Sequence, residues 1–272
     1  MKIIAEIGSN WLINDELNQL AYISLLVKQL DFVDYIKFQF WDTDKFVQPN
    51  HPSYDKVKKF QVPESLYKPI FDLIGPERFM VTCFDTETAD KMKEIGCINW
   101  KIASGDITYE SLITHIAKFK DPMWISTGNA DNYEITRAAY IAGKINNEIT
   151  MMHCVSKYPT KANEVGIMYI DRLKRQFPYF KVGLSTHTTI PAVNKACGMA
   201  IALGADCVEV HVKLDNKMQS MDSPFSLTVE DLKFLKKDID TYESMCYNIE
   251  QDENEKIWAR RNENGLRPNK EL

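Results

Sequence analysis

Two lysines lie within apolar stretches of the sequence, where an unpaired charge is costly. Lys37 is part of Tyr-Ile-Lys-Phe-Gln, and Lys101 is part of Trp-Lys-Ile-Ala-Ser-Gly. A lysine at the end of a strand is more often a solvated charge, but these apolar neighbours indicate partial burial, and a buried ammonium group needs an anionic partner. Hydroxyl groups that end other apolar runs could share this partner: Thr82, Ser104, Ser126 and Ser185. Together in one cavity, the ammonium and hydroxyl groups would bind a phosphate or a carboxylate.

Two histidines, His187 and His211, also end apolar runs. If these runs are neighbouring strands, the two imidazoles converge and could bind a divalent metal ion, with water and substrate oxygens at its open positions. Two separately hydrogen-bonded histidines are the alternative interpretation. His153, within Met-Met-His-Cys, is more typical of a buried core histidine.

A carboxylate, Glu6, stands in the first apolar run, Ile-Ile-Ala-Glu-Ile-Gly. Burial would raise the pKa of this carboxyl group and suit it to proton transfer. A hydrogen-bonded core carboxylate is an equally good interpretation, because buried glutamates are usually paired.

The elements that must position these residues follow from the hydrophobic pattern. Short apolar runs alternate with longer segments in which apolar residues recur every three or four positions, which is typical of parallel strands covered by helices. We expect strands over residues 3–7, 33–40, 79–82, 99–103, 123–127, 150–155, 181–185 and 207–212, and helices over 16–30, 87–95, 134–142, 168–176, 191–203 and 229–248. Eight strands predict an α/β fold of the (β/α)8 TIM barrel type, with its functional residues at the C-terminal ends of the strands.

The chain is predicted to hold one domain. Residues 1–248 are expected to form the catalytic barrel, and the charged tail 249–272 to form no separate domain. Residues 41–63 contain Pro49, Pro52 and Pro63. This segment is too long for a plain connection, so we expect a functional loop over the site.

Composition narrows the classes of partner and compartment. The formal net charge of the 272 residues is -5, and without a clustered basic face this argues against nucleic-acid binding. The sequence shows neither a secretory signal nor an apolar run of about 20 residues that could span a bilayer, so a cytoplasmic protein without a membrane partner is expected. The six cysteines form no CxxC pair, which favours reduced core thiols over disulfides or zinc.

Several motifs together resemble the sialic acid synthase family, also called N-acetylneuraminate synthases, along nearly the whole chain. In chain order the motifs are Ala5-Glu6-Ile7-Gly8, Lys37-Phe38-Gln39, Lys101-Ile102-Ala103-Ser104-Gly105, Ile125-Ser126-Thr127-Gly128, His153-Cys154 followed by Tyr158-Pro159-Thr160, Gly183-Leu184-Ser185-Thr186-His187-Thr188, and Glu209-Val210-His211.

This resemblance implies a transferase that condenses phosphoenolpyruvate with the open-chain aldehyde of an N-acylated amino sugar, giving a sialic-acid-like nonulosonic acid and phosphate. It implies that His187 and His211 bind Mn2+ or Mg2+, and that Glu6 helps to move protons. It implies that phosphoenolpyruvate is bound by Lys37, Thr82, Lys101, Ser104, Ser126 and Ser185. The implied contacts of the sugar are Gln39, Asp106, Tyr158 and Asp222.

The sequence departs from the family pattern at several points. The family's Asn-His-Asn-Gly loop is replaced by Asn10-Trp11-Leu12-Ile13, its Glu after Ser-Gly by Asp106, its Pro after Thr82 by Cys83, and its usual Asp before the metal-binding His by Thr186. The family's antifreeze-like domain, which supplies an Arg to the sugar across a dimer, has no counterpart in this sequence. The sequence therefore leaves three arrangements open: a monomer, a homodimer held by contacts between barrels, or a complex with a separate partner that provides this lid.

The same departures leave two other functions open. A barrel that has lost catalysis and binds a sugar or phosphoenolpyruvate as a subunit is the first alternative. An aldolase or synthase acting on a phosphorylated sugar ranks last. Such a substrate needs a second basic cluster, and the sequence offers no candidates at strand ends beyond Lys157 and Lys213. Schiff-base chemistry through Lys37 or Lys101 is disfavoured.

Overall fold

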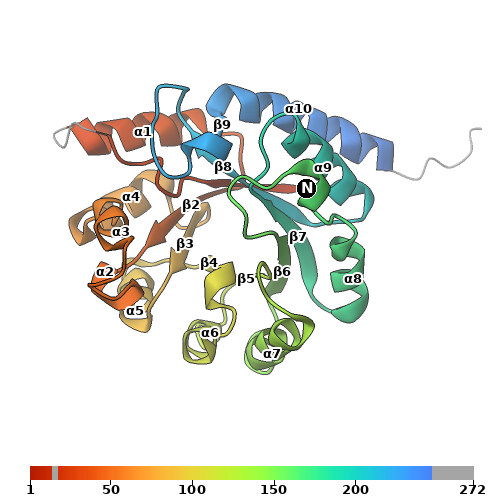
Figure 1. Ribbon diagram of the computed structural model, residues 1–272, viewed down its shortest axis with the longest axis horizontal. Coiled ribbons are helices and arrows are strands. Elements are labelled where there is room, and N and C mark those ends of the chain that lie inside the picture. Colours follow the sequence, from red (N-terminus) through yellow and green to blue (C-terminus); the bar gives the residue numbers. More distant parts are fainter. Residues whose placement is uncertain (14–17, 247–272) are drawn as a thin grey trace, which may run out of the picture.

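Eight parallel strands close into a barrel in the computed structural model, which describes residues 1–13 and 18–246 (Figure 1). Each strand pairs with the next strand in the sequence, and β1 pairs with β8 to complete the circle. The strands are β1 (Lys2–Glu6), β2 (Tyr35–Phe40), β3 (Phe79–Cys83), β4 (Trp100–Ile102), β5 (Met123–Ser126), β6 (Ile149–Cys154), β7 (Lys181–Thr186) and β8 (Cys207–Lys213). The predicted (β/α)8 barrel is confirmed, and each predicted strand overlaps an observed one.

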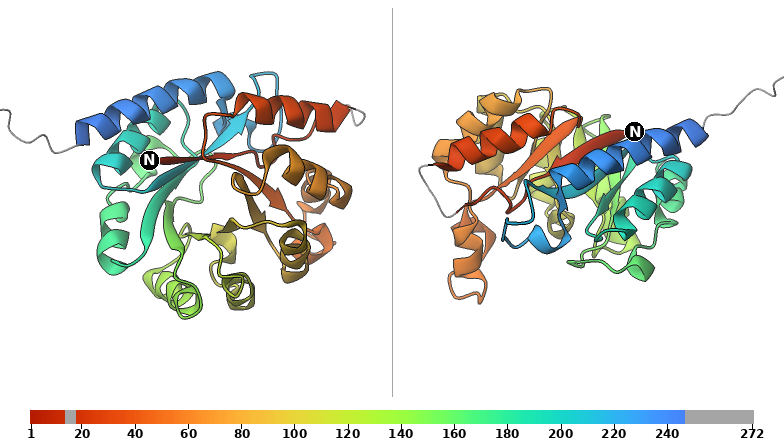
Figure 2. Two further views of the ribbon diagram at one scale, coloured as in Figure 1. Left: turned by 180° about the vertical axis from the view of Figure 1, so that it is seen from behind. Right: turned by 90° about the horizontal axis from the view of Figure 1, so that it is seen from above.

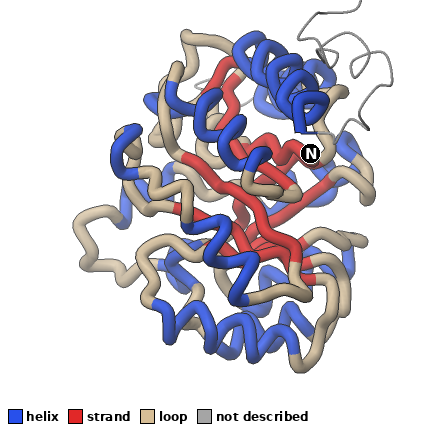
Figure 3. The backbone as a smooth tube through the Cα atoms, turned by 90° about the vertical axis from the view of Figure 1, so that its right-hand side faces the viewer, coloured by secondary structure: helices blue, strands red, loops and turns tan. Residues whose placement is uncertain are grey.

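Helices surround the strands on the outside, as the ring in Figure 1 and the backbone tube in Figure 3 show. One helix of this ring follows each strand: α1 (Gln19–Gln29), α4 (Tyr67–Ile74), α5 (Thr86–Ile95), α6 (Glu110–Ala117), α7 (Asn132–Gly143), α8 (Tyr169–Gln176), α9 (Ala192–Ala202) and α10 (Val229–Cys246). The short strand β9 (Leu227–Thr228) pairs in parallel with the end of β8, just before α10. The hydrophobic pattern of the sequence did not indicate α4 and α6.

The segment after β2 is more ordered than the sequence indicated. The functional loop expected over residues 41–63 contains two short helices, α2 (Thr43–Phe46) and α3 (Tyr54–Lys59). The side chain of Asp42 caps α2 by accepting a hydrogen bond from the backbone N–H of Asp44 at 3.1 Å. In the right-hand view of Figure 2, the orange segment with α2 and α3 projects from the barrel on the same side as the light-blue loop after β8.

The alternation of side chains along the strands divides the core in two. Residues that point outward pack against the helices in the large hydrophobic cluster, while a small separate cluster fills the bottom of the barrel: Ile4, Tyr35, Met80, Trp124, Met152 and Cys207. Gly183 makes room for this plug, because a Cβ atom there would lie 2.5 Å from both Met152 Sδ and Cys207 Sγ. Two residues further along most of these strands, the same inward face turns polar, at Glu6, Lys37, Thr82, Ser126 and Glu209.

The remaining expectations concern cysteines and the chain end. Five cysteines are buried free thiols and Cys246 is an exposed one, so the prediction of reduced core thiols holds for five of the six. The predicted boundary at residue 248 and the charged tail 249–272 lie outside the described residues.

Candidate active site

A layer of four buried ionisable side chains crosses the barrel directly above the apolar plug. Glu6 comes from β1, Lys37 from β2, Lys101 from β4 and Glu209 from β8, and none of them is more than 3% exposed. Lys37 Nζ forms an ion pair with Glu6 and lies 3.6 Å from Glu209 Oε1, while Lys101 Nζ lies 3.8 Å from Glu209 Oε2. Two ammonium groups thus face two carboxylates, so the layer is formally neutral.

Sequence reasoning missed Glu209 as a site residue. The signal was present, because Glu209 precedes His211 by two positions in one strand, and such residues point to the same face. Glu209 is the group that links the two lysines, since it contacts both.

The charges of this layer are set by mutual contacts as much as by burial. Burial by itself would lower the pKa of Lys37, but Glu209 and Glu6 outweigh it and raise that pKa. For Lys101 burial dominates and lowers the pKa, although Glu209 opposes the effect. Burial would raise the pKa of Glu209, but Lys101 and Lys37 hold it below its usual value. Glu209 is therefore the fixed negative charge between two cations.

Hydroxyl groups surround the two ammonium groups, as the sequence predicted. Lys37 Nζ donates to Thr82 Oγ1 at 3.2 Å, and Lys101 Nζ donates to Ser126 Oγ at 2.6 Å. Ser185 Oγ donates to Glu209 Oε1 at 3.1 Å. Ammonium and hydroxyl donors in one layer are the groups that phosphate and carboxylate oxygens accept from.

Ser104 completes this donor set through a backbone contact. The N–H of Gly128 donates to Ser104 Oγ at 3.1 Å. A Cβ atom on Gly128 would lie 2.5 Å from Ser156 Oγ and 2.7 Å from Ser104 Oγ, so only glycine allows this approach.

The two predicted metal-binding histidines lie side by side. The ring centroids of His187 and His211 are 5.2 Å apart, and both residues line the same cavity. His187 Nδ1 donates to the carbonyl oxygen of Val155 at 3.0 Å, which leaves Nε2 with a free lone pair. Burial, followed by the neighbouring His211, lowers the pKa of His187 to about 4. His187 is therefore a neutral imidazole at pH 7.

This donor set fits a divalent ion that takes most of its ligands from elsewhere. Within residues 1–13 and 18–246, no group of three or more His, Cys, Asp and Glu side chains is arranged to hold a metal. The carbonyl oxygen of Val155 fixes Nδ1 of His187, so Nε2 is the nitrogen that could bind a metal ion. The two imidazoles would supply two positions, and water and substrate oxygens the others.

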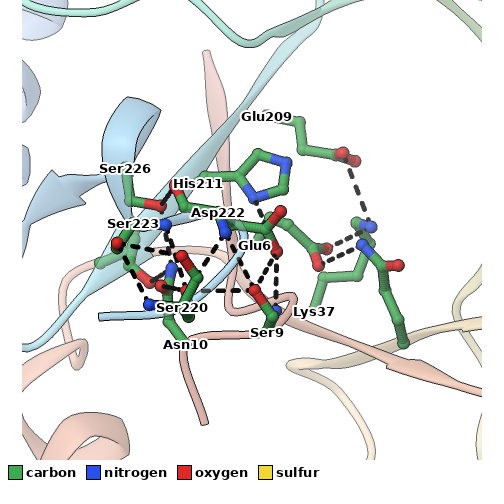
Figure 4. A network of polar contacts seen from close by, with 12 residues as sticks. Glu6, Ser9, Asn10, Lys37, Glu209, His211, Ser220, Asp222, Ser223 and Ser226 are labelled. Carbon is green, nitrogen blue, oxygen red and sulfur yellow. Dashed lines mark hydrogen bonds and ion pairs between the residues drawn. The ribbon is translucent and has the colours of Figure 1, made fainter. Parts of the chain in front are cut away.

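Asp222 is held beside the histidines by a network that joins the loops after β1 and β8 (Figure 4). Asp222 Oδ2 accepts hydrogen bonds from Ser9 N at 2.7 Å and Ser9 Oγ at 2.9 Å, and it lies 3.8 Å from His211 Nδ1. Gly8 permits this contact, because its φ is +50° and a Cβ atom would lie 2.3 Å from Asp222 Oδ2. Ser220 Oγ donates to Asn10 Oδ1 at 2.6 Å and ties the same loops together again.

A cavity of about 670 Å³ opens above the charged layer. Twelve of the predicted site residues line it: Lys37, Gln39, Thr82, Lys101, Ser104, Asp106, Ser126, Tyr158, Ser185, His187, His211 and Asp222. Glu6 is fully buried beneath the cavity, where it pairs with Lys37 and accepts a hydrogen bond from Gln39 Nε2 at 2.8 Å. The structure thus brings the predicted residues together, with Glu6 as a supporting group.

Two of the predicted sugar contacts have distinctive surroundings. The Tyr158 ring lies over His187 with the centroids 4.2 Å apart. Burial raises the pKa of Asp106 to about 7, against the opposing effect of Lys101.

His153, which the sequence marked as a core residue, is buried and its Nε2 lies 2.7 Å from the Val165 carbonyl oxygen.

Sequence reasoning also missed one side of the cavity mouth. Trp41, Lys45, Phe46 and Phe84 line it there, and Ser9 lines it beside Asp222. The residues of this side come from the segments after β2 and β3.

Comparison with known proteins identifies the family of the chain. The model of the NeuB family matches residues 30–251. The chain belongs to the NeuB family.

Two individual proteins are similar to this chain in sequence. An uncharacterized protein of Methanocaldococcus jannaschii is 33% identical over 221 residues, covering 78% of this chain and 63% of the relative. The N,N'-diacetyllegionaminic acid synthase of Campylobacter jejuni is 37% identical over 160 residues, covering 58% of this chain and 47% of that enzyme. The chain therefore spans under two thirds of the length of either relative.

The fold recurs in a solved structure of a named enzyme. The N-acetylneuraminic acid (sialic acid) synthetase of Leptospira borgpetersenii, solved with citrate, superposes with a TM-score of 0.82 at 26% identity, covering 93% of this chain and 88% of that one. Among the described helices of this NeuB-family chain, none has the length and apolar character to cross a membrane.

Proposed function

We propose that this NeuB-family barrel condenses phosphoenolpyruvate with the aldehyde of an N-acylated amino sugar, giving a sialic-acid-like nonulosonic acid and phosphate. The observation that carries the proposal is the buried layer in which Lys37 and Lys101 share Glu209, ringed by hydroxyl groups at the floor of the cavity. The names of the C. jejuni and L. borgpetersenii relatives, both sugar-acid synthases, support it.

The floor of the cavity suits the anionic substrate. Phosphoenolpyruvate carries a phosphate and a carboxylate, and Lys37 and Lys101 with Thr82, Ser104, Ser126 and Ser185 are the donors for these groups. Because Glu6 and Glu209 already neutralise the two lysines, a bound anion competes with these carboxylates for them.

The reaction itself needs the two substrates stacked in one cavity. C3 of phosphoenolpyruvate forms a bond to the aldehyde carbon, water adds to C2, and the bond from C2 to the phosphate oxygen breaks. The two protons of the water end on the new hydroxyl group and on the released phosphate. Gln39, Asp106, Tyr158 and Asp222 are the polar groups that orient the sugar above the anion.

Metal binding and the role of Glu6 complete the proposal. His187 and His211 would hold Mn2+ or Mg2+, which supplies Lewis-acid polarisation of a substrate oxygen when bound. Glu6 acts on the substrates through Lys37 and Gln39, whose side chains it contacts beneath the cavity.

Phosphate release from phosphoenolpyruvate, measured with a panel of N-acylated amino sugars and with Mn2+ or chelator, tests the proposal. Release should require both sugar and metal. Lys101→Ala should abolish it, because the anion loses a buried cationic partner, whereas Lys68→Ala, which removes a lysine from an exposed pair with Asp72, should retain it. Full activity of Lys101→Ala would refute the assignment of the anion site. Binding of phosphoenolpyruvate without release for any sugar would favour a barrel that has lost catalysis.

A further inference from the structure

The two histidines of the cavity differ in what holds their Nδ1 atoms. Nδ1 of His187 donates to the Val155 carbonyl oxygen at 3.0 Å, whereas Nδ1 of His211 is buried and has no hydrogen-bond partner. Asp222 Oδ2 faces this second nitrogen at 3.8 Å (Figure 4). A buried nitrogen that carries a proton requires an acceptor. Asp222 is therefore placed to decide which nitrogen of His211 is protonated.

The loop after β8 supplies a second contact to the same imidazole. The ring of Phe225 lies edge-on to that of His211, with the centroids 4.9 Å apart and an angle of 75° between the planes. Phe225 is only 5% exposed. The loop thus places one apolar group and one charged group against His211, and only the charged group is a strong acceptor for a ring N–H.

Ser9 fixes the carboxylate of Asp222 from the loop after β1. Its backbone N–H and its hydroxyl group donate to Asp222 Oδ2 at 2.7 and 2.9 Å. The contact with His211 involves the same oxygen. Oδ2 therefore serves the protein, and Oδ1 is left for the sugar contact of the proposed function.

The hydroxyl group of Ser220 joins the two loops. It donates to Asn10 Oδ1 at 2.6 Å, accepts from the backbone N–H of Asp222 at 3.2 Å and lies 3.1 Å from Ser9 Oγ. The hydroxyl group of Ser223 acts within its own loop instead, since it accepts from Ser220 N and donates to the Ser220 carbonyl oxygen, both at 3.2 Å. Ser220 is thus the residue that sets Asp222 relative to the loop after β1.

We infer that Asp222 is a positioning residue for His211, and that Ser220 keeps it in place. Asp222 accepts the proton of His211 Nδ1, which leaves the lone pair of Nε2 free for a ligand. A carboxylate in this role also makes the imidazole a stronger metal ligand. Both histidines then offer Nε2, His187 through a carbonyl oxygen and His211 through a carboxylate. The inference rests on the proposed function only for the metal.

Nuclear magnetic resonance of the metal-free protein, labelled at its histidine ring nitrogens, tests the tautomer directly. The chain has five histidines, and His211→Gln identifies the signals of His211 by their loss. On the neutral ring of the native protein, the proton should lie on Nδ1. It should move to Nε2 in Asp222→Ala, because the acceptor is gone, and partly so in Ser220→Ala.

Calorimetric titration with Mn2+ alone, without either substrate, tests the consequence for metal binding. Asp222→Ala should weaken the affinity by about 10–100-fold, and Ser220→Ala should weaken it by about 10-fold. Ser223→Ala is the matched control, because it removes a hydroxyl group and two hydrogen bonds from the same loop, and it should keep the native affinity. The affinity for phosphoenolpyruvate should be native in all three variants, since the lysines hold the anion.

A His211 proton on Nε2 in the native protein, or on Nδ1 in Asp222→Ala, would overturn the inference. Equal losses of Mn2+ affinity in Ser220→Ala and Ser223→Ala would also overturn it, because that pattern reports general damage to the loop. If the native protein binds no Mn2+, the metal assignment of the proposed function fails, and the tautomer alone decides the inference. If Mn2+ binds but no sugar releases phosphate, the proposed function fails, while both measurements still decide the inference.

Discussion

Replacing Glu209 by Gln tests whether this carboxylate is the shared counter-charge of Lys37 and Lys101. The substitution keeps the size of the side chain but removes a buried charge that lies 3.6 and 3.8 Å from the two ammonium nitrogens. At an effective dielectric constant of about 20, each such pair contributes about 4 kcal/mol of attraction. The desolvation of the carboxylate cancels much of this sum, so we expect a net loss of about 3–5 kcal/mol in the free energy of unfolding.

The same variant should respond more strongly to an anion. Lys37 keeps Glu6, but Lys101 loses its charged partner in the layer. Inorganic phosphate can take the place of the missing carboxylate, so it should raise the free energy of unfolding more in Glu209→Gln than in the native protein. Urea unfolding followed by circular dichroism, with and without phosphate, measures both effects.

The control is Asp72→Asn, which also removes a carboxylate from a lysine but does so in an exposed i, i+4 pair. It should change stability far less and should not alter the response to phosphate. If Glu209→Gln is as stable as the native protein, or if phosphate stabilises both equally, Glu209 is not the counter-charge of the anion site.

Three further changes probe the rest of the site. Because the pKa of Asp106 is raised from 3.8 to about 7 in the folded state, the native protein retains this proton longer than the unfolded chain, so stability should fall from about pH 4 to pH 7. Asp106→Asn should flatten that fall in urea unfolding, and a curve of the same shape would refute the assignment. Gly8→Ala places a methyl group against Asp222 at a φ of +50°, so it should lower the free energy of unfolding by about 1–3 kcal/mol. It should also raise the KM for the sugar more than the KM for phosphoenolpyruvate. Equal changes in both KM values would show that Asp222 does not contact the sugar. Chelation should stop phosphate release and leave the affinity for phosphoenolpyruvate nearly unchanged in calorimetry, since the lysines rather than the histidines hold the anion; loss of both would place the metal in the anion site.

The sequence predicted the barrel well because its signal is local. Each strand is a short apolar run, and a polar residue at its end, such as Lys37 or His187, points to the face where the strands of a (β/α)8 barrel carry their functional groups. The order of the strands needed no further information, since consecutive parallel strands pair in sequence.

What the sequence left out depends on contacts between distant segments. Glu209 stands in the middle of an apolar strand, and its role appears only when Lys37 and Lys101 from two other strands approach it. The aromatic side of the cavity mouth escaped notice for the same reason, because Trp41 and Phe84 follow different strands and become neighbours only in the folded barrel. The prolines of residues 41–63 hid two short helices, since α2 ends before Pro49 and α3 lies between Pro52 and Pro63.

The pairing of β1 with β8 has a consequence for folding during synthesis on the ribosome. Lys2 is the register partner of Cys207, so the two strands that close the barrel are separated by about 200 residues of chain. At a synthesis rate of about 5–20 residues per second, β1 waits about 10–40 s for its second neighbour. Throughout this interval the edge of β1 that later pairs with β8 is open and can pair with other chains. Aggregation of the incomplete chain must therefore be prevented until β8 has been synthesised.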